Sequence, residues 1–569
     1  MKTHLLSSAL SAAILIAAAQ AFAHDAQYHV AQNTELKQFG GNELPVTAAR
    51  GSKVPLWPNL VGHRFAASTA SDEAQTYVDQ AMMLTFGFNH AEAGRSFKQA
   101  QKLDPSCAMC FWGEALVLGP NINAPMDPGA NAPALSALAK AKALAGTASP
   151  REQALIAALA SRYAPDTERA VLDQAYADAM ADVAAKFPED DDVAVLYAEA
   201  LMDLSPWDYW ADGGAKPKGS TADIVSILER VLARNPDHIG AIHLYIHAVE
   251  ASTRPERAEP YADRLAKMEI GAGHLVHMPS HIYYRVGRYA DSLEVNRRAV
   301  ATDEAFFQAV APEGLYAGGY YPHNIHFLLV SAQMAGDGPT AIEAAEKLST
   351  AISDELAQAA PAFVLPIKAA PLFVHAQFTD PGTILGIDRP TGAFPFVDAA
   401  WHYMRGVAQA ARGDIEAARI ERAAIAEIAK SSDLSALEEG GMPAADILAI
   451  AGHVLEGRIA QAGDDWSAAA QAFADAKKVE DGLPYMEPRH CYYPVGQSLG
   501  AALLRVGDLD GAEKAFRESL VLAPSNGWSL FGLSEVYRAR GDKALAEMTT
   551  QQWHNAWIGD TSLLHLDRL

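Results

Sequence analysis

The chain has 569 residues, half of them apolar, and a formal net charge of −24 at pH 7. This length and apolar content allow a large hydrophobic core. The strong negative charge argues against nucleic acid and anionic membrane surfaces as partners, because like charges repel, and it helps to keep a large chain in solution.

Residues 1–23 have the pattern of a cleavable export signal. Lys2 supplies the positive start, residues 5–19 form a short apolar run, and Ala-Phe-Ala at 21–23 places small residues at the cleavage site. The run is short for a bilayer span, and no other segment reaches the ~18 apolar residues that a span needs. We therefore expect an exported, periplasmic chain without an integral membrane segment after cleavage.

Residues 24–70 contain scattered Pro and Gly and little periodicity, so we expect an extended arm that wraps the first helices. Residues 71–349 then show the apolar periodicity of helices. In the first helix pair, Ala81 falls on one helix, Phe97 falls on the next, and Pro105 closes it. We expect this stretch to form an N-terminal helical block.

The chain has three cysteines, of which Cys107 and Cys110 lie three residues apart at the start of a predicted helix. In an oxidising compartment they could form a disulfide. A pair of small side chains packed at a helix contact and a metal-binding pair are the alternatives. No thioredoxin-like βαβ pattern surrounds them, which disfavours an oxidoreductase.

Residues 350–398 have a less certain helical register, and we expect a connecting segment with a long Pro- and Gly-rich loop at 380–395. A more regular C-terminal block follows at 399–569. No strand pattern is convincing anywhere. The chain has no P-loop, dinucleotide-binding glycine motif or nucleophile elbow.

A two-helix unit is clearest near the end of the chain. Leu499 and Gly500 fall on one helix, Gly507 interrupts it, and Phe516 falls on the next helix, which Pro524 closes. The small residues let two antiparallel helices approach while the large apolar residues fill the space between them. Turns of the same kind are expected at four more glycines: Gly336, Gly413, Gly463 and Gly541.

This unit resembles the tetratricopeptide repeat (TPR), whose period is ~34 residues, and the resemblance covers about four fifths of the chain. It implies an all-α, TPR-type solenoid, a right-handed superhelix of helix hairpins that binds a protein or peptide partner in its concave groove. The segments Asp104–Ala115 and His277–Ile282 look like those of long exported bacterial TPR proteins without an assigned activity. The resemblance carries over no catalytic residue.

Histidines gather on the first helices of three successive units, which in a TPR superhelix line the concave face. The three groups are His243 and His247 with Glu250; His274, His277 and His281; and His323 with His326. Neutral imidazoles that converge from adjacent helices are a usual way to hold zinc, copper or iron. The predicted metal ligands are His243, His247, His277, His281, His323 and His326.

Two other interpretations of the histidines stay open. They could line a metal-free ligand groove, with some packed as hydrogen-bonded core, or they could serve a metal-dependent enzyme. In the enzyme, Glu250 is the candidate base that acts on a metal-bound water. Pro279 could kink the helix between His277 and His281, or it could start a short helix.

Tyrosines at the starts of first helices are candidates to grip a ligand with a rigid ring and a hydroxyl. The predicted groove residues are Tyr283, Tyr320, Tyr321, Asn324, Tyr492 and Tyr493. Aromatic packing at the helix entry is the alternative. The leading hypothesis is an exported TPR solenoid that binds a protein, peptide or small ligand in a His- and Tyr-lined groove together with a transition metal. A metal-dependent enzyme and a structural assembly scaffold are the alternatives.

Overall fold

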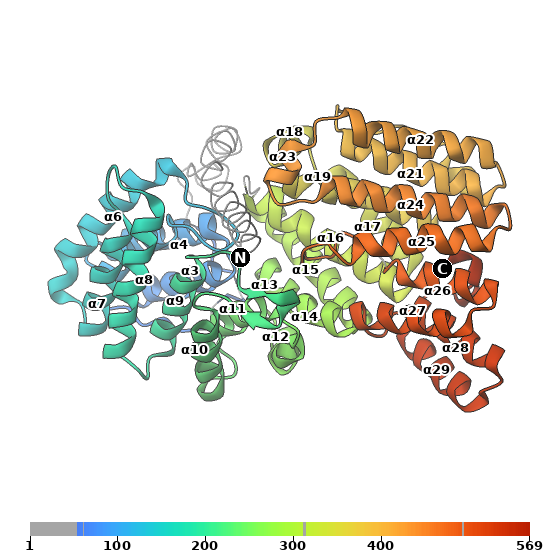
Figure 1. The fold of residues 1–569 in the computed structure, drawn as a ribbon. Coiled ribbons are helices and arrows are strands. Elements are labelled where there is room, and N and C mark those ends of the chain that lie inside the picture. The colour runs from blue at the N-terminus through green and yellow to red at the C-terminus, as the bar shows by residue number, and fades with distance from the viewer. Residues whose placement is uncertain (1–53, 58, 61, 311–314, 492–493) are drawn as a thin grey trace, which may run out of the picture. The chain divides into compact units, whose positions relative to one another are not determined.

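The computed structural model describes residues 54–569 except 58, 61, 311–314 and 492–493 (Figure 1). The expected export signal, most of the N-terminal arm, and Tyr492 and Tyr493 lie outside the described residues.

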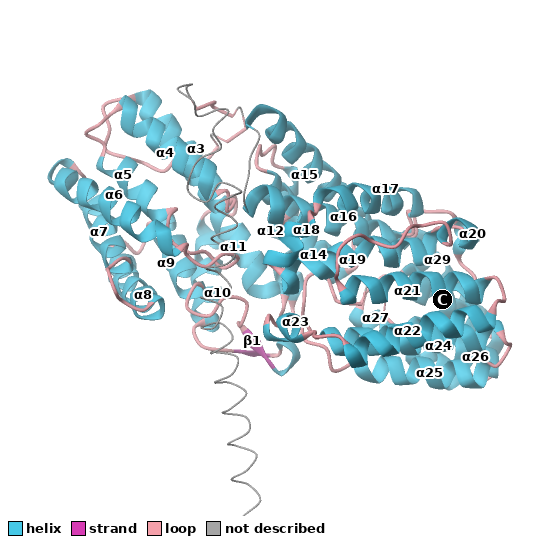
Figure 2. Cartoon of the chain, turned by 90° about the horizontal axis from the view of Figure 1, so that it is seen from above, coloured by secondary structure: helices cyan, strands magenta, loops and turns pink. Residues whose placement is uncertain are grey.

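Apart from one small ribbon, the regular secondary structure of the described chain is helical (Figures 1 and 2). In that ribbon β1 (Trp210–Ala211) pairs antiparallel with β2 (Lys216–Pro217), with Trp210 opposite Pro217. Two-residue strands leave no alternation for a sequence pattern to reveal. No helix of the described residues combines the length and apolar character of a membrane span. The predicted all-α fold of helix hairpins is confirmed.

The described residues separate into two compact units. The N-terminal unit holds residues 54–282 and 295–324, and the C-terminal unit holds residues 283–294 and 325–569. Three helices are divided between the units: α14 (Pro279–Val286), α15 (Tyr289–Val310) and α16 (Tyr321–Ala335). The boundaries of the sequence-defined blocks stay a prediction.

The remaining α-helices lie wholly within one unit. Those of the N-terminal unit are α3 (Asp72–Phe86), α4 (His90–Leu103), α5 (Ala108–Leu116), α6 (Asn131–Leu144), α7 (Pro150–Leu159), α8 (Arg169–Lys186), α9 (Asp191–Met202), α10 (Thr221–Arg234), α11 (Ile239–Glu250), α12 (Glu259–Lys267) and α13 (Gly273–His277). Those of the C-terminal unit are α17 (Gly338–Ala351), α18 (Asp354–Ala359), α19 (Pro361–Phe378), α20 (Pro381–Ile384), α21 (Pro395–Ala411), α22 (Ile415–Ser431), α23 (Ser435–Glu439), α24 (Ala444–Ala462), α25 (Trp466–Glu480), α26 (Gly496–Val506), α27 (Leu509–Leu522), α28 (Gly527–Arg540) and α29 (Lys543–Ala556).

Several hairpin turns share one local structure, in which a glycine with positive φ is followed by an aspartate that caps the next helix. Gly507 ends α26 at φ 91°, and the Asp508 carboxylate accepts the backbone N–H of Gly511 at the start of α27. The same Gly–Asp pair occurs at 336–337, 413–414 and 541–542. Glycine adopts positive φ at little cost, and aspartate satisfies a free N–H at the helix start.

Small residues on one helix make room for a phenylalanine of the paired helix. A Cβ on Gly457 of α24 would lie 2.4 Å from the Phe473 ring of α25, and a Cβ on Gly500 of α26 would lie 2.8 Å from the Phe516 ring of α27. Both rings are fully buried. Figures 1 and 2 show the resulting close alignment of α21, α22, α24 and α25.

The described end of the N-terminal arm lies against the first helix. The Tyr77 hydroxyl of α3 donates to the Val54 carbonyl, and the Phe65 backbone N–H donates to Asp79. Beyond α4, Cys107 and Cys110 form a disulfide at the start of α5, which selects one of the three alternatives for this pair.

The connecting segment 350–398 is more helical than its sequence pattern suggests. It contains α18, α19 and α20, and its longest loop is the stretch after α20 and before α21. Pro366 and Pro371 lie inside α19. Proline inside a helix removes a backbone hydrogen bond and obscures the helical pattern, so the register of α19 was uncertain from the sequence.

Candidate metal centre

The histidine cluster of the N-terminal unit is built from the first helices of successive hairpins. His243 and His247 lie on α11, His274 and His277 on α13, and His281 on α14. These five side chains are at most 2% exposed. The start of α16 contributes His323, whose ring centroid is 4.9 Å from that of His277. We call these six residues the histidine cluster.

Glu250 orients two histidines through its two carboxylate oxygens. The Nδ1 of His247 lies 2.8 Å from Oε1, and the Nδ1 of His281 lies 2.9 Å from Oε2. A carboxylate accepts hydrogen bonds, so each neutral ring carries its proton on Nδ1 and keeps a lone pair on Nε2. This is the arrangement in which an outer carboxylate fixes the orientation of a metal-binding histidine.

His243 and His277 are held in the same way by other acceptors. The Nδ1 of His243 lies 2.5 Å from the Phe86 carbonyl, and the Nδ1 of His277 lies 2.6 Å from Oδ1 of Asn296. The Phe86 carbonyl favours the His243 tautomer with the proton on Nδ1. Among the described residues, the Nε2 atoms of His243 and His247 have no hydrogen-bond partner.

The Nε2 atoms of His277 and His281 lie only 2.8 Å apart. The Oγ of Ser280 lies 3.1 Å from Nδ1 of His277. In the His277 tautomer with its proton on Nε2, Nδ1 accepts from Ser280 and Nε2–H donates to Nε2 of His281. Burial, followed by the proximity of His281, lowers the pKa of His277 well below its usual value.

The imidazole rings of three residues lie close together in a second group: His243, His247 and His274. Their ligand atoms lie within 4.8 Å of one another. Among the described residues, neither ring nitrogen of His274 has a hydrogen-bond partner, nor does Nε2 of His243 or His247. Burial is the largest cause that lowers the pKa of all three rings. They stay neutral at pH 7, which is the form that binds metal.

Aromatic side chains surround this second group. The Phe88 ring centroid lies 4.4 Å from that of His243, and the Tyr320 centroid lies 4.7 Å from that of His274. Trp207 packs edge-on against His247 at 5.0 Å and is 38% exposed, so it separates the cluster from solvent. An apolar surrounding strengthens the attraction between a cation and its ligands.

A buried carboxyl supports α13 from the neighbouring helices. Asp303 of α15 accepts hydrogen bonds from the Tyr316 hydroxyl and the Asn324 amide, both at 2.7 Å. The backbone N–H of His274 donates to the same Tyr316 hydroxyl at 3.3 Å. Burial raises the pKa of Asp303 to about 7. Tyr316 begins one turn of π-helix, Tyr316–Tyr320, which is a feature common near functional sites.

The structure brings together five of the six predicted ligands. His326 is buried, belongs to the C-terminal unit and is in neither group. His274 lies in one of these groups, although it was not among the predicted ligands. Its spacing of three residues from His277 could have indicated it, because that spacing places two side chains on one helix face. Pro279 is the first residue of α14, with a turn at Met278 before it, as one of the two alternatives expected.

The predicted groove residues have different surroundings. The Tyr320 ring packs against His274 of the histidine cluster. The buried Asn324 amide donates to Asp303, and the Tyr321 hydroxyl donates to Glu304. Tyr283, in the C-terminal unit, is 2% exposed. Their role in binding a ligand stays a prediction. Both oxygens of Glu250 contact histidines, and its role as a base stays a prediction.

A third histidine group near the start of α9 has a structural explanation. His63 and His238 both contact Oδ1 of Asp192 through Nε2, at 2.7 and 3.2 Å. The Nδ1 of His238 accepts the Ala241 backbone N–H and caps α11. Each ring is thereby used within the protein.

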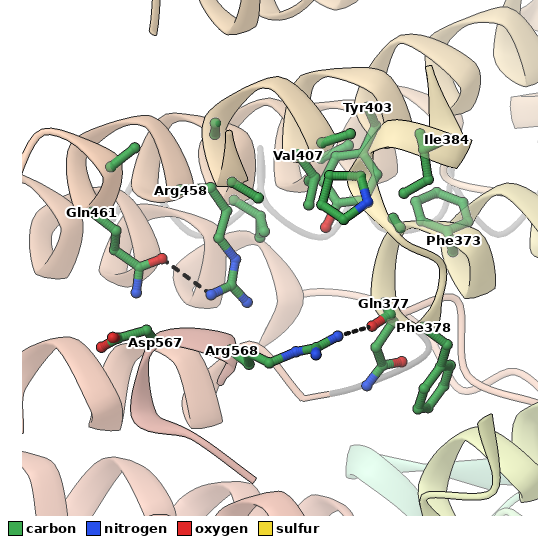
Figure 3. Close-up of a pocket in the computed structure, with 18 of the residues that line it drawn as sticks. Phe373, Gln377, Phe378, Ile384, Tyr403, Val407, Arg458, Gln461, Asp567 and Arg568 are labelled. Atoms are coloured by element: carbon green, nitrogen blue, oxygen red, sulfur yellow. Dashed lines mark hydrogen bonds between the residues drawn. The ribbon is translucent and has the colours of Figure 1, made fainter. Parts of the chain in front are cut away.

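The C-terminal unit contains a cavity of about 830 Å³ (Figure 3). Its walls include apolar side chains such as Phe373 and Val407, and it also includes the guanidinium groups of Arg458 and Arg568. Arg458 donates to Gln461, and Arg568 donates to the Gln377 carbonyl, as the dashed lines in Figure 3 show. We call this space the C-terminal cavity.

No protein-family model and no curated protein matches the sequence. Solved structures with low similarity include the human IFIT1 dimer with PPP-AAAA, which is 14% identical over 86% of this chain and 91% of that chain, with a TM-score of 0.30. The APC/C hetero-tetramer Cut9–Hcn1 is 12% identical over 87% and 75% of the two chains, with a TM-score of 0.28. Yeast Tom70 is 12% identical over 87% and 94%, with a TM-score of 0.26.

All three are TPR-repeat proteins. Because every TM-score is below 0.5, this likeness carries no argument about the site. The fold rests on the helix hairpins described above.

Proposed function

We propose that the chain is an exported, TPR-like helical-repeat protein that binds a transition metal through the histidine cluster. The observation that supports this most is the convergence of His243, His247 and His274, whose ligand atoms lie within 4.8 Å of one another. Among the described residues, the Nε2 atoms of His243 and His247 and both ring nitrogens of His274 have no hydrogen-bond partner. Buried polar atoms without partners are costly, whereas a bound cation would make them ligands.

The charge and polarity of the cluster suit late first-row metals. Its ligands are neutral imidazoles, which bind zinc, copper, iron and nickel, while calcium and magnesium prefer oxygen. Glu250 supplies a negative charge behind His247 and His281. Binding and positioning of a metal is proposed ahead of hydrolysis with Glu250 as base, because both carboxylate oxygens already accept from histidines.

Export is the part of the proposal that the sequence alone supports, through the pattern of residues 1–23. Cell fractionation with a periplasmic and a cytoplasmic marker tests it. Recovery of an N-terminally processed chain in the periplasmic fraction is expected, and an unprocessed chain in the cytoplasm would contradict it.

The C-terminal cavity favours a second candidate function, the binding of a small organic anion with an apolar body. Neither Arg458 nor Arg568 has a carboxylate partner among the described side chains, and Nε2 of Gln461 has no partner there. Burial and the nearby Arg458 lower the pKa of Arg568. Two cations that face one cavity repel, and an anion between them would relieve this repulsion.

Calorimetry with benzoate and with benzyl alcohol tests the second candidate function, since only benzoate has the charge. Binding of benzoate that is lost in Arg458→Met supports it, and equal behaviour of the two probes would overturn it. Neither outcome depends on metal.

The test of metal binding uses the processed chain without an affinity tag. The protein is stripped with a chelator, exposed to zinc, desalted, and measured for bound metal by mass spectrometry. Zinc should remain bound to the wild type and to a control, His453→Ala, which alters a lone histidine of α24. Loss from the control or absence from the wild type would contradict the proposal. Circular dichroism checks that each variant folds.

A further inference from the structure

We infer that the C-terminal cavity binds an organic phosphate monoester, with the phosphate group between Arg458 and Arg568 and the apolar part of the ligand in the cavity interior. This inference rests on the second candidate function, the binding of an organic anion, and narrows it to one ligand class. It concerns the C-terminal unit alone and does not depend on metal binding.

The interior of the cavity is apolar. Its walls include the buried side chains of Tyr403 on α21 and of Ile447, Ile450 and Val454 on α24. Figure 3 shows Tyr403 and Phe373 on the same side of the space. A cavity of ~150 Å³ can hold benzene, and this cavity measures about 830 Å³. A ligand therefore has room for an apolar part larger than one benzene ring.

Two guanidinium groups line the cavity at an exposed side. Arg568 is exposed and Arg458 is partly buried, and Figure 3 shows both groups pointing into the same part of the space, where their charges interact. Arg458 donates to Oε1 of Gln461 at 3.1 Å and to Oγ of Ser498 at 3.4 Å, and Arg568 donates to the Gln377 carbonyl at 2.8 Å. A guanidinium has five N–H donors, so both groups keep donors for a ligand.

Gln461 supplies a further donor beside Arg458. Its Oε1 accepts from Arg458, which sets the orientation of the amide and makes Nε2 the donor. This Nε2 is buried and has no hydrogen-bond partner among the described residues. A buried donor without an acceptor is costly. Two guanidinium groups and one amide therefore favour a ligand with several acceptor oxygens.

The carboxylates that line the cavity are engaged by other groups. Asp567 pairs with Arg505, Asp464 accepts the indole N–H of Trp466 at 2.7 Å, and Asp380 caps the start of α20. All three are exposed, and salt water screens their charges. Within the described part of the chain, neither cavity arginine forms an ion pair with a carboxylate. A bound anion would supply the missing counter-charge.

A phosphate monoester matches this set of donors. It carries a charge of about −1.5 to −2 at pH 7 and three terminal acceptor oxygens, whereas a carboxylate carries one charge and two oxygens. Guanidinium groups bind phosphate oxygens through pairs of parallel N–H donors. The ligand charge would balance both arginines, and its three oxygens can be shared among Arg458, Arg568 and Nε2 of Gln461.

The test compares the binding of four probes to the wild type by calorimetry at pH 8, where the phosphate is fully ionised. The probes are 1-naphthyl phosphate, 1-naphthoate, 1-naphthol and phenyl phosphate. We expect 1-naphthyl phosphate to bind ~10-fold more tightly than 1-naphthoate, because it offers one more oxygen and more charge. It should also bind ~10-fold more tightly than phenyl phosphate, because its second ring buries more apolar area. The uncharged 1-naphthol should bind most weakly of the three naphthyl probes.

Variants assign the binding to the cavity. Arg458→Met and Arg568→Met should each lower the affinity for 1-naphthyl phosphate by ~10–100-fold and leave the affinity for 1-naphthol nearly unchanged. Arg419→Met is the matched control, because Arg419 is an exposed arginine of α22 that does not line the cavity. Circular dichroism checks that each variant folds. An unchanged affinity for 1-naphthyl phosphate in both cavity variants would overturn the inference.

The outcomes separate this inference from the second candidate function on which it rests. If no probe binds, or if 1-naphthol binds as tightly as the two naphthyl anions, the second candidate function falls and the inference falls with it. If 1-naphthoate equals 1-naphthyl phosphate and both exceed 1-naphthol, an anion site stands and the phosphate assignment is overturned. Equal binding of phenyl phosphate and 1-naphthyl phosphate would also overturn the inference, because the interior would then not hold the apolar part. The wild-type comparison decides the matter even where a variant fails to fold.

Discussion

Replacing His274 by leucine should stabilise the metal-free protein and weaken metal binding. The ring is 1% exposed, and neither of its nitrogens has a partner among the described residues. A buried polar group without a partner costs ~1–3 kcal/mol, and an imperfect fit of the new side chain costs up to ~1.5 kcal/mol. We expect the free energy of unfolding of the metal-free protein to rise by ~1–2 kcal/mol.

The assay is urea unfolding of wild type and His274→Leu, each with and without zinc. Zinc at 100 times its Kd stabilises a protein by ~2.7 kcal/mol, so the wild type should gain more from zinc than the variant. His326→Leu is the control, because His326 is also buried but lies outside the histidine cluster. The reasoning is refuted if His274→Leu destabilises the metal-free protein by more than ~2 kcal/mol and retains the full response to zinc.

Three further predictions concern other parts of the molecule. Glu250→Gln should leave the helix content measured by circular dichroism unchanged and lower the affinity for zinc by ~10–100-fold. An unchanged Kd in a zinc competition assay would exclude an orienting role for Glu250. Gly500→Ala should lower the free energy of unfolding by ~1–3 kcal/mol, because the new Cβ would press against Phe516. Gly452→Ala, with no atom within 4 Å of the new Cβ, should raise it by up to ~1 kcal/mol. Equal effects of the two changes in calorimetry would contradict the packing argument. Burial raises the pKa of Glu480 from 4.5 to about 7, so the native state binds more protons than the unfolded state and this residue lowers stability as pH rises from 4.5 to 7. Glu480→Gln should therefore add ~3 kcal/mol at pH 8 and little at pH 4.5, and a gain that is independent of pH in urea unfolding would show that the carboxyl does not titrate in this way.

The hairpin fold could be predicted because its signals are local. Gly507 and Gly541 stop helices through positive φ, and the following aspartates start the next helices. The Gly463 turn shows the limit of such signals, since the residue with positive φ there is Asp464, at 58°. Helix α19 was hidden by its internal prolines, whose cost is offset by tertiary packing that the sequence does not reveal.

Much of the candidate site could also be predicted, because the spacing of His243, His247 and Glu250 defines one helix face. What could not be predicted are the groups that fix the rings. The acceptor for His243 is the backbone carbonyl of Phe86, 157 residues away, and a carbonyl has no sequence signal. Asn296 is 19 residues from His277 on another helix. The C-terminal cavity likewise depends on packing between distant helices.

X-ray absorption at the zinc edge of the loaded wild-type protein tests the central claim most directly, because it reports which atoms surround the metal. We expect about three imidazole nitrogens at ~2.0–2.1 Å from each zinc, with the scattering pattern of intact rings. A coordination shell dominated by carboxylate or water oxygens, without imidazole scattering, would show that the histidine cluster does not bind the metal.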